Sequence, residues 1–325
     1  MSDLCIKLKD KVLGGGEITF EEAVELICLE GPLVFDLIAS ANWIRNTYKK
    51  NKVILCSIIN AKCGGCPEDC AFCSQSVHHQ TDIASYPLLP SDEIIDTAKK
   101  AFSEGATEFS IVTSGRGISE EKEISSLAET FSKFNENLNI PSCASLGLLD
   151  LDTALKFKAA GLKNYHHNLE TAKSFFQNIC STHTYEESVD TVRIAKSAGF
   201  RVCSGGIFGM GESPRQRVEL AFILKELDVD SIPMNFLNPI PGTPLESIPP
   251  LKPLEILKTI ATYRFVFPKR DITICGGREI NLRDLQALMF IAGANGTMLG
   301  NYLTTRGRAS QADLQMIKDL ELEVD

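Results

Sequence analysis

From residue 53 onward, short apolar segments rich in β-branched residues alternate with longer segments of helical periodicity. The first of these, Val53–Ile59, is typical of a buried strand. Strands that alternate regularly with helices form parallel sheets, because each helix carries the chain back to the start of the next strand. Eight strands are expected in all, the number that closes a (β/α)8 TIM barrel in the α/β class. The other expected strands are Thr107–Thr113, Ile140–Leu146, Leu162–Asn168, Phe200–Gly206, Ser231–Leu237, Asp271–Cys275 and Thr297–Tyr302.

The segments between the expected strands have the apolar periodicity of amphipathic helices. One of them begins at Ser213-Pro214, where the serine can cap the helix and the proline suits its first position. An open doubly wound sheet is the alternative architecture, but no G-x-G-x-x-G motif follows the first strand. One further helix is expected to start at Ser91, and another is expected to end at Ala198. The remaining expected helices are Ser119–Asn135, Asp150–Ala160, Pro253–Phe267 and Leu282–Ala292.

The two ends of the chain have different characters. Residues 1–50 are expected to form a helical extension that closes one end of the barrel, with Thr19 capping one helix and Pro32–Tyr48 forming another. Residues 51–310 would then be the barrel. Residues 311–325 form a polar C-terminal tail that we expect to be mobile.

Composition excludes several classes of function. The chain has 325 residues, 44% of them hydrophobic, and a formal net charge of −9, so it offers no basic footprint for nucleic acid. It contains no apolar run near the ~18 residues that a membrane span needs. The N-terminus has no signal-peptide pattern, so we expect a cytoplasmic protein. Its eleven cysteines are then expected to be reduced thiols, several of them metal ligands.

Three of these cysteines, Cys66, Cys70 and Cys73, form a C-x3-C-x2-C pattern directly after the first strand. Structural zinc usually takes four ligands in paired hooks, whereas thiolates in one tight loop suit an iron–sulfur cluster. Three cysteines on a four-iron cluster leave one iron open for another ligand. The alternatives are a degenerate zinc hook and a cluster used only for electron transfer. The position favours catalysis, because barrel active sites lie at the C-terminal ends of the strands.

Polar residues and glycines gather where the other expected strands end. The glycine-rich turn Gly205–Glu212 would let backbone approach a ligand closely. Asn168 and Glu170 alternate onto one face and are candidates to hold sugar hydroxyls. His166 and His167 are adjacent, so at most one of them is expected to face the barrel interior. Each cluster alone is also compatible with a simple turn, but five at one rim indicate a binding site.

A second set of cysteines lies on odd-numbered strands, at Cys56, Cys143, Cys203 and Cys275. Interior layers of such barrels take side chains from alternate strands, so these four could ring one cavity. Cysteine is also a common small core residue, which is the alternative for each of them alone. We favour a second metal–sulfur site. Of the others, Cys63 is a weaker candidate, and Cys5, Cys28 and Cys180 are expected in helices or outer segments and to be inert.

Over about residues 20–305, the sequence resembles the biotin synthase family of radical S-adenosylmethionine (SAM) enzymes. Phe72, just before the last cysteine of the loop, is part of the similarity. The motifs that carry the resemblance are Asn60–Ser76, His167–Thr171, Val202–Glu212, Asn235 with Gly242–Leu245, Gly277–Glu279, Ala292–Asn295 and Leu303–Thr305.

The resemblance implies a (β/α)8 sulfurtransferase that converts dethiobiotin to biotin. A [4Fe–4S] cluster on Cys66, Cys70 and Cys73 would bind SAM and cleave it to a 5′-deoxyadenosyl radical, which removes hydrogen from dethiobiotin under anaerobic conditions. Residues implied to contact SAM are Phe72, Asn168, Glu170, Gly205, Ile207, Gly209 and Glu212. Residues implied to contact dethiobiotin are His166, Asn168, Asn235, Thr304 and Thr305.

The chain departs from the family at the second, sulfur-donating cluster. The family's [2Fe–2S] cluster uses three cysteines and one arginine, but Ser110 and Thr273 stand at two of those four positions. His166 stands where the family has an asparagine. We therefore expect a differently built cluster, with a four-iron form as one candidate. Its expected ligands are Cys143, Cys203 and Cys275, with Cys56 as the fourth. We also expect Cys275 to be a catalytic residue.

Two other functions share some of these features. A radical SAM enzyme of the hydrogenase-maturation type has the same loop and barrel but need not have Asn235 with Thr304 and Thr305. An iron–sulfur electron carrier would have all its irons ligated by protein and would not bind SAM. The family resemblance also implies reduced flavodoxin or ferredoxin as the electron donor, a homodimer, and neither nucleic acid nor membrane as a partner.

Overall fold

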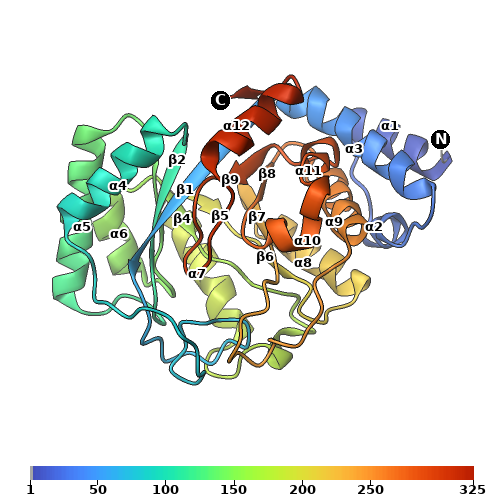
Figure 1. The fold of residues 1–325 in the computed structure, drawn as a ribbon. Helices are drawn as coiled ribbons and strands as arrows, with labels where there is room; N and C mark the ends of the chain where they lie inside the picture. The colour runs from blue at the N-terminus through green and yellow to red at the C-terminus, as the bar shows by residue number, and fades with distance from the viewer. Residues whose placement is uncertain (1–2) are drawn as a thin grey trace.

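The structure, a computed structural model, describes residues 3–325 and contains a closed parallel barrel (Figure 1). Each barrel strand pairs in parallel with the next, and β9 returns to pair with β1, with Cys56 opposite Met298. The closure confirms the predicted (β/α)8 barrel and excludes the open sheet. The eight barrel positions are taken by β1 (Lys52–Lys62), β2 (Glu108–Thr113), β3 (Ser142–Ser145), β4 (Asn164–His166), β5 (Arg201–Cys203), β7 (Ser231–Phe236), β8 (Asp271–Ile274) and β9 (Gly296–Met298).

The fifth strand is interrupted, which corrects the single strand expected over Phe200–Gly206. After β5 the chain bends and continues as β6 (Gly206–Phe208), which pairs with β7. The bend requires Gly205, because a Cβ there would lie 1.9 Å from the carbonyl oxygen of Pro233. Backbone that needs glycine for close approach is a common reason for a break in a strand.

The helices return along the outside of the barrel and bury its outer face (Figure 1). Aromatic side chains such as Phe109 and Phe134 fill the layer between sheet and helices. The helix expected over Leu282–Ala292 is instead three short pieces, α10 (Arg278–Leu282), η2 (Arg283–Leu285) and α11 (Leu288–Ile291). The outer helices are α4 (Ser91–Ser103), α5 (Glu121–Asn137), α6 (Leu151–Ala159), α7 (Tyr185–Ser197), α8 (Pro214–Glu226) and α9 (Pro253–Val266), with η1 (Phe176–Asn178) before α7.

Three helices precede the barrel: α1 (Asp3–Leu13), α2 (Phe20–Ile27) and α3 (Leu33–Lys49). Thr19 caps α2 as expected, in a reciprocal capping box with Glu22. The end of α3 reaches the start of β8, where Lys49 pairs with Asp271 at 2.7 Å. These helices lie away from the long loops that carry the cysteine motif (Figure 1).

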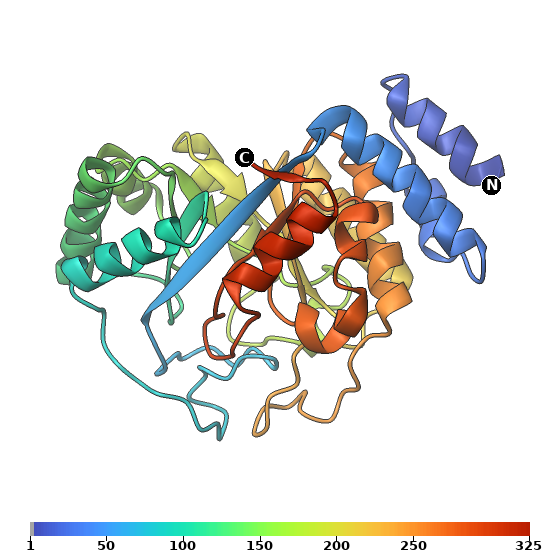
Figure 2. The same cartoon turned by 45° about the horizontal axis from the view of Figure 1, so that its top comes forward.

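The C-terminal residues are ordered, which corrects the mobile tail expected for residues 311–325. The helix α12 (Ser310–Asp319) lies beside β1 on the outside of the barrel (Figure 2), and β10 (Glu323–Val324) adds a short parallel strand to β1. Asp313 of α12 forms a paired contact with Arg278, and both side chains are fully buried. The polar sequence of this segment concealed that ion pair.

None of the helices in residues 3–325 combines the length and the apolar character that crossing a bilayer requires.

Candidate active site

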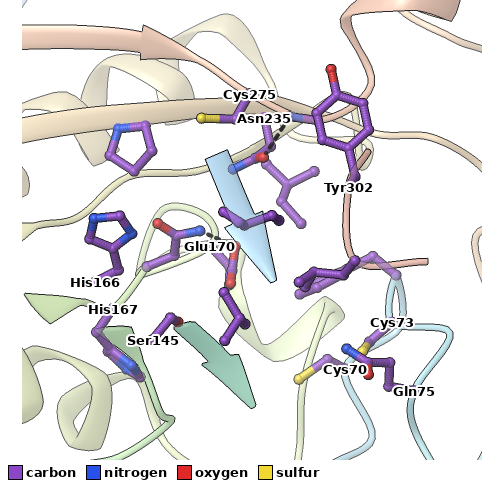
Figure 3. A pocket seen from close by; sticks show the side chains of 18 of the residues that line it. Cys70, Cys73, Gln75, Ser145, His166, His167, Glu170, Asn235, Cys275 and Tyr302 are labelled. Carbon is purple, nitrogen blue, oxygen red and sulfur yellow. Dashed lines mark hydrogen bonds between the residues drawn. The ribbon is translucent and has the colours of Figure 1, made fainter. Parts of the chain in front are cut away.

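A cavity of about 440 Å³ opens at the end of the barrel where the strands terminate. It is lined by the cysteine loop between β1 and α4 and by residues that follow several strands. In Figure 3, Cys70 and Cys73 lie on one side of this cavity, and Cys275 and Asn235 lie on the opposite side. The predicted site residues that line it are Cys56, Cys66, Cys70, Phe72, Cys73, His166, Asn168, Glu170, Cys203, Ile207, Asn235, Cys275, Thr304 and Thr305.

Backbone hydrogen bonds inside the cysteine loop set part of its shape. The amide of Cys66 donates to the carbonyl of Gln75 at 3.0 Å, and the amide of Val77 returns a bond to Cys66 at 2.9 Å. The amide of Cys73 donates to the carbonyl of Cys70 at 2.9 Å. All three cysteines line one cavity, although the loop contains no helix or strand of its own.

The three thiols fit a cluster chemically. Burial raises the pKa of the Cys66 thiol and raises that of Cys73 to about 11. In this setting the thiols keep their protons unless a strong positive charge stabilises the thiolates, which a bound metal does. A site of one buried and two half-buried thiols beside one cavity therefore suits an iron cluster better than it suits three free thiolates.

The acidic pair Glu68-Asp69 inside the loop binds the segment Cys180–His183, which sequence reasoning had missed. Asp69 accepts from the amide of Ser181 at 2.9 Å, and Glu68 lies 2.5 Å from Nδ1 of His183. Cys180 is buried, with its Sγ 3.8 Å from that of Cys70. The expectation that Cys180 lies in an outer segment is therefore wrong. Cys70 and Cys180 are 110 positions apart along the chain, and no local sequence pattern predicts their contact.

Asn168 and Glu170 follow β4 and face the cavity together. Asn168 Nδ2 donates to Glu170 Oε2 at 3.4 Å, and Asn168 Oδ1 accepts from the amide of Gly205 at 3.2 Å. Burial raises the pKa of Glu170 to about 7. Glu170 also has a positive φ of 63°, which is uncommon outside glycine and marks a constrained position. Both side chains are thus held by the strand ends rather than free in a loop.

The residues of the glycine-rich turn divide into two groups. Ile207 lines the cavity and packs with Phe72 on a small apolar cluster around Met210. Glu212 is buried behind the wall, where it accepts from the amides of Gly209 and Met210, both at 2.8 Å. Within residues 3–325, Gly205, Gly209 and Glu212 are not part of the cavity lining, so their contact with a cofactor stays a prediction.

His166 and His167 both line the cavity, which corrects the expectation that at most one faces inward. Strand β4 ends at His166, so the alternation of a strand no longer applies at the next residue. Burial lowers the pKa of each imidazole to about 4, which keeps both rings neutral at ordinary pH. Nε2 of each ring is buried and has no hydrogen-bond partner among the described residues.

Asn235 and the two threonines close the cavity from other sides. Asn235 Oδ1 accepts from the amide of Gly276 at 3.0 Å, whereas its Nδ2 has only a long contact of 3.5 Å to the carbonyl of Gly206. Thr304 shares a 3.0 Å hydrogen bond with Ser74 of the cysteine loop. Asn235 therefore keeps a weakly used donor at the cavity surface.

The second set of cysteines gathers deeper in the barrel. Cys56, Cys203 and Cys275 line the cavity, and burial raises the pKa of Cys203 and of Cys275 to about 12. Cys143 is buried beside them but is not part of the described lining, and its Sγ accepts from Asn164 Nδ2 at 3.2 Å. Thr273, at the family's arginine position, also faces the cavity.

The charged side chains beside Cys56, which form the floor of the barrel, were also not predicted from the sequence. Cys56 Sγ lies 3.3 Å from Glu108 Oε2, and Glu108 accepts from Arg201 at 3.1 Å. Arg201 also pairs with Asp271, which Lys49 contacts from α3. The pairing of Glu108 opposite Cys56 on neighbouring strands creates this floor, and no local sequence pattern predicts it.

Two family descriptions match the chain. Residues 62–224 match the Radical SAM superfamily, and residues 233–323 match the Biotin and Thiamin Synthesis associated domain.

The chain is similar over nearly its whole length to proteins named biotin synthase. The protein of Geobacter sulfurreducens is 53% identical over 317 residues, covering 98% of this chain and 96% of that protein. The protein of Geotalea uraniireducens is 52% identical, covering 97% and 96%. The protein of Carboxydothermus hydrogenoformans is 49% identical and covers 100% of both.

Solved structures with the same fold include methylornithine synthase, with a TM-score of 0.86 and 24% identity over 98% of this chain and 97% of that chain. The FeFe-hydrogenase maturase HydG from Carboxydothermus hydrogenoformans has a TM-score of 0.82 and 16% identity over 99% and 79%. These likenesses concern the fold alone.

Proposed function

The chain belongs to the biotin synthase family of radical SAM enzymes, and from this premise we propose how its barrel inserts sulfur into dethiobiotin. The enzyme is a sulfurtransferase that uses SAM and a [4Fe–4S] cluster. One observation carries the residue assignments that follow. Two groups of cysteines and a set of polar side chains face the same cavity from opposite sides.

Cys66, Cys70 and Cys73 would hold the cluster. Asn168 and Glu170 would accept hydrogen bonds from the hydroxyls of the SAM ribose. Bound together, cluster and SAM supply a 5′-deoxyadenosyl radical that removes hydrogen from an unactivated carbon. The protein's task is to orient the reactants and to keep water out. Phe72 and Ile207 would form part of the apolar wall that keeps water out. Gly205, Gly209 and Glu212 would shape the turn that carries Ile207.

Dethiobiotin would bind between the two groups of cysteines. Asn235 would donate through Nδ2 to the ureido oxygen, because its Oδ1 is already used by Gly276. Asn168 and the neutral His166 would contact the same ring. Thr304 and Thr305, from the loop after β9, would donate to the carboxylate at the far end of the substrate.

The sulfur donor would be a second iron–sulfur cluster on Cys143, Cys203 and Cys275, with Cys56 as the fourth ligand. Thr273 cannot replace the family's arginine in length or charge, and Ser110 offers no thiolate. Cys275 lies two residues beyond Thr273 and faces the cavity. Four buried thiols in one barrel suit a four-iron cluster, whereas the family's usual ligand set is incomplete here.

The experiment is an anaerobic assay of the full-length protein reconstituted with iron and sulfide. With SAM, dethiobiotin and reduced flavodoxin or ferredoxin, we expect both 5′-deoxyadenosine and biotin. SAM cleavage without biotin would point to another radical SAM reaction, such as that of a hydrogenase maturase. A lack of SAM cleavage in protein with a complete four-iron cluster would point to an electron carrier.

The electron donor, a homodimeric assembly and a cytoplasmic location follow from the family resemblance and stay proposals. Comparing turnover with flavodoxin and with ferredoxin tests the donor. Light scattering of the reconstituted protein tests the dimer, and a monomer with full activity would contradict it.

A further inference from the structure

Cys70 of the cysteine loop shares a group of donor atoms with two residues outside the described chemistry, Cys180 and His183. The Sγ atoms of Cys70 and Cys180 are 3.8 Å apart, and the Sγ of Cys180 is 3.2 Å from Nδ1 of His183. The three donor atoms lie within 4.8 Å of one another. Cys180 and His183 are not among the residues assigned above to either cluster.

We propose that the cluster-free protein binds one thiophilic divalent cation, such as zinc or ferrous iron, on Cys70, Cys180 and His183. Two thiolates on a tetrahedral zinc, each about 2.3 Å from the metal, stand about 3.8 Å apart. The Cys70–Cys180 separation therefore already matches that geometry. The imidazole is nearer to Cys180 than in an ideal site, and a small outward rotation of its ring corrects this.

A candidate fourth ligand lies beside Cys180, although it is not within 4.8 Å of all three donor atoms and would have to turn toward the cation. Asp69 Oδ1 lies 3.2 Å from the Sγ of Cys180 and belongs to the cluster loop itself. Two thiolates, an imidazole and a carboxylate form a donor set that suits zinc and ferrous iron and does not suit magnesium or calcium. Binding would displace the protons that these thiols and Nδ1 of His183 still hold.

The surroundings already orient the imidazole. Glu68 lies 2.5 Å from Nδ1 of His183 and also accepts from Thr182 at 2.7 Å and from Arg116 at 3.1 Å. When a metal replaces the proton on Nδ1, Glu68 keeps those two donors and is not left unpaired. The carboxylate would then support the site from outside, as such groups commonly do.

The consequence is competition for Cys70. Only this part rests on the proposed function, because it assumes that Cys70 is also a ligand of the SAM cluster. One thiolate cannot serve both centres in their separate positions, so the mononuclear site and the complete cluster exclude each other. Zinc binds such sites more tightly than ferrous iron does, so zinc should block assembly of the cluster.

The first test uses cobalt as a spectroscopic probe of the full-length, iron-free, fully reduced protein under anaerobic conditions. We expect one tightly bound equivalent at this site, with sulfur-to-cobalt charge-transfer bands. Cys180→Ser should weaken those bands because one thiolate is lost, and His183→Gln should keep them with a shifted ligand-field spectrum. Each variant should bind cobalt at least about a hundredfold more weakly, since the loss of a ligand costs no less than the loss of an outer-shell partner. Cys63→Ser is the matched control, because Cys63 is a buried thiol at the same loop but outside the group. Circular dichroism checks that each variant is folded.

The second test measures competition. Zinc added before iron and sulfide should stop four-iron cluster assembly in the wild type and in Cys63→Ser, but not in Cys180→Ser. Cobalt affinity and spectra that are unchanged in Cys180→Ser and His183→Gln would overturn the site. Cobalt binding as expected, together with normal cluster assembly in zinc-loaded protein, would keep the site and contradict only the assignment of Cys70 to the SAM cluster.

Discussion

The two polar atoms of the Asn235 side chain differ in how they are paired. Its oxygen accepts from the amide of Gly276 at 3.0 Å, next to Cys275, while its nitrogen has only a 3.5 Å contact to Gly206. The oxygen therefore has a structural role and the nitrogen is the candidate for dethiobiotin. A substitution that keeps the oxygen and removes the nitrogen isolates the second role.

We predict that Asn235→Asp weakens dethiobiotin binding by roughly ten- to a hundredfold, because a lost partner for a buried polar group costs about 1–3 kcal/mol. SAM binding should change little. Asn235→Ala should lose the same affinity and also some stability, since it leaves the Gly276 amide unpaired. Equilibrium binding of each ligand to reconstituted protein checks this, and an equal loss of SAM and dethiobiotin binding would show that the pocket is misassigned.

Glu170 should make the stability of the iron-free protein depend on pH. Its pKa is raised from 4.5 to about 7 by burial, so the folded state holds a proton that the unfolded state releases. The resulting stabilisation is complete below about pH 4.5 and is lost as the pH rises through about 7. Allowing for solvent in the cavity, the loss is about 1–2 kcal/mol.

Glu170→Gln should remove this dependence. Urea unfolding of iron-free wild type and variant between about pH 5 and about pH 8 is the measurement. The free energy of unfolding of the variant, relative to wild type, should rise with pH. Parallel curves would mean that the carboxyl is already ionised across this range.

At the scale of elements, the cysteine loop and α12 are each fixed by contacts between distant segments. The loop depends on Glu68-Asp69 and the segment Cys180–His183, and α12 depends on the buried pair of Asp313 with Arg278. Arg278 begins α10, three residues after Cys275, which directly follows β8. The C-terminal helix therefore supports the rim of the active site.

We predict that Asp313→Ala destabilises the protein by about 3–5 kcal/mol, because it leaves a fully buried guanidinium without its carboxylate. Asp319→Ala is the matched control, since Asp319 is exposed on the same helix and bonds only to Gln315 in the described structure. Chemical unfolding of both variants gives the comparison. Equal, small effects would mean that α12 is not anchored through this pair.

At the scale of the whole molecule, the sequence predicts the barrel well because its signal is repeated. Each strand–helix unit has its own periodicity, and the closing contact of β9 with β1 follows once eight units are counted. The same rule predicts the site, since it brings the ends of all strands to one rim. Cys66, Glu170, Asn235 and Cys275 meet there although the sequence separates them widely.

What could not be predicted depends on pairs of residues that no local pattern connects. Cys180 meets Cys70, and Arg278 meets Asp313, only because the fold is complete. The break at Gly205 depends on the neighbouring carbonyl of Pro233. Alternation also failed at His167, because β4 ends one residue earlier.

The central claim is that Cys275 helps to hold the sulfur-donating cluster in place of the family's arginine. The most direct measurement compares anaerobically prepared wild type, Cys275→Ala and the exposed control Cys28→Ala for iron, sulfide, Mössbauer spectrum, 5′-deoxyadenosine and biotin. We predict that Cys275→Ala keeps the SAM cluster and still makes 5′-deoxyadenosine, but holds less iron and sulfide and forms no biotin. Full iron and sulfide content with normal biotin formation in Cys275→Ala would contradict the claim.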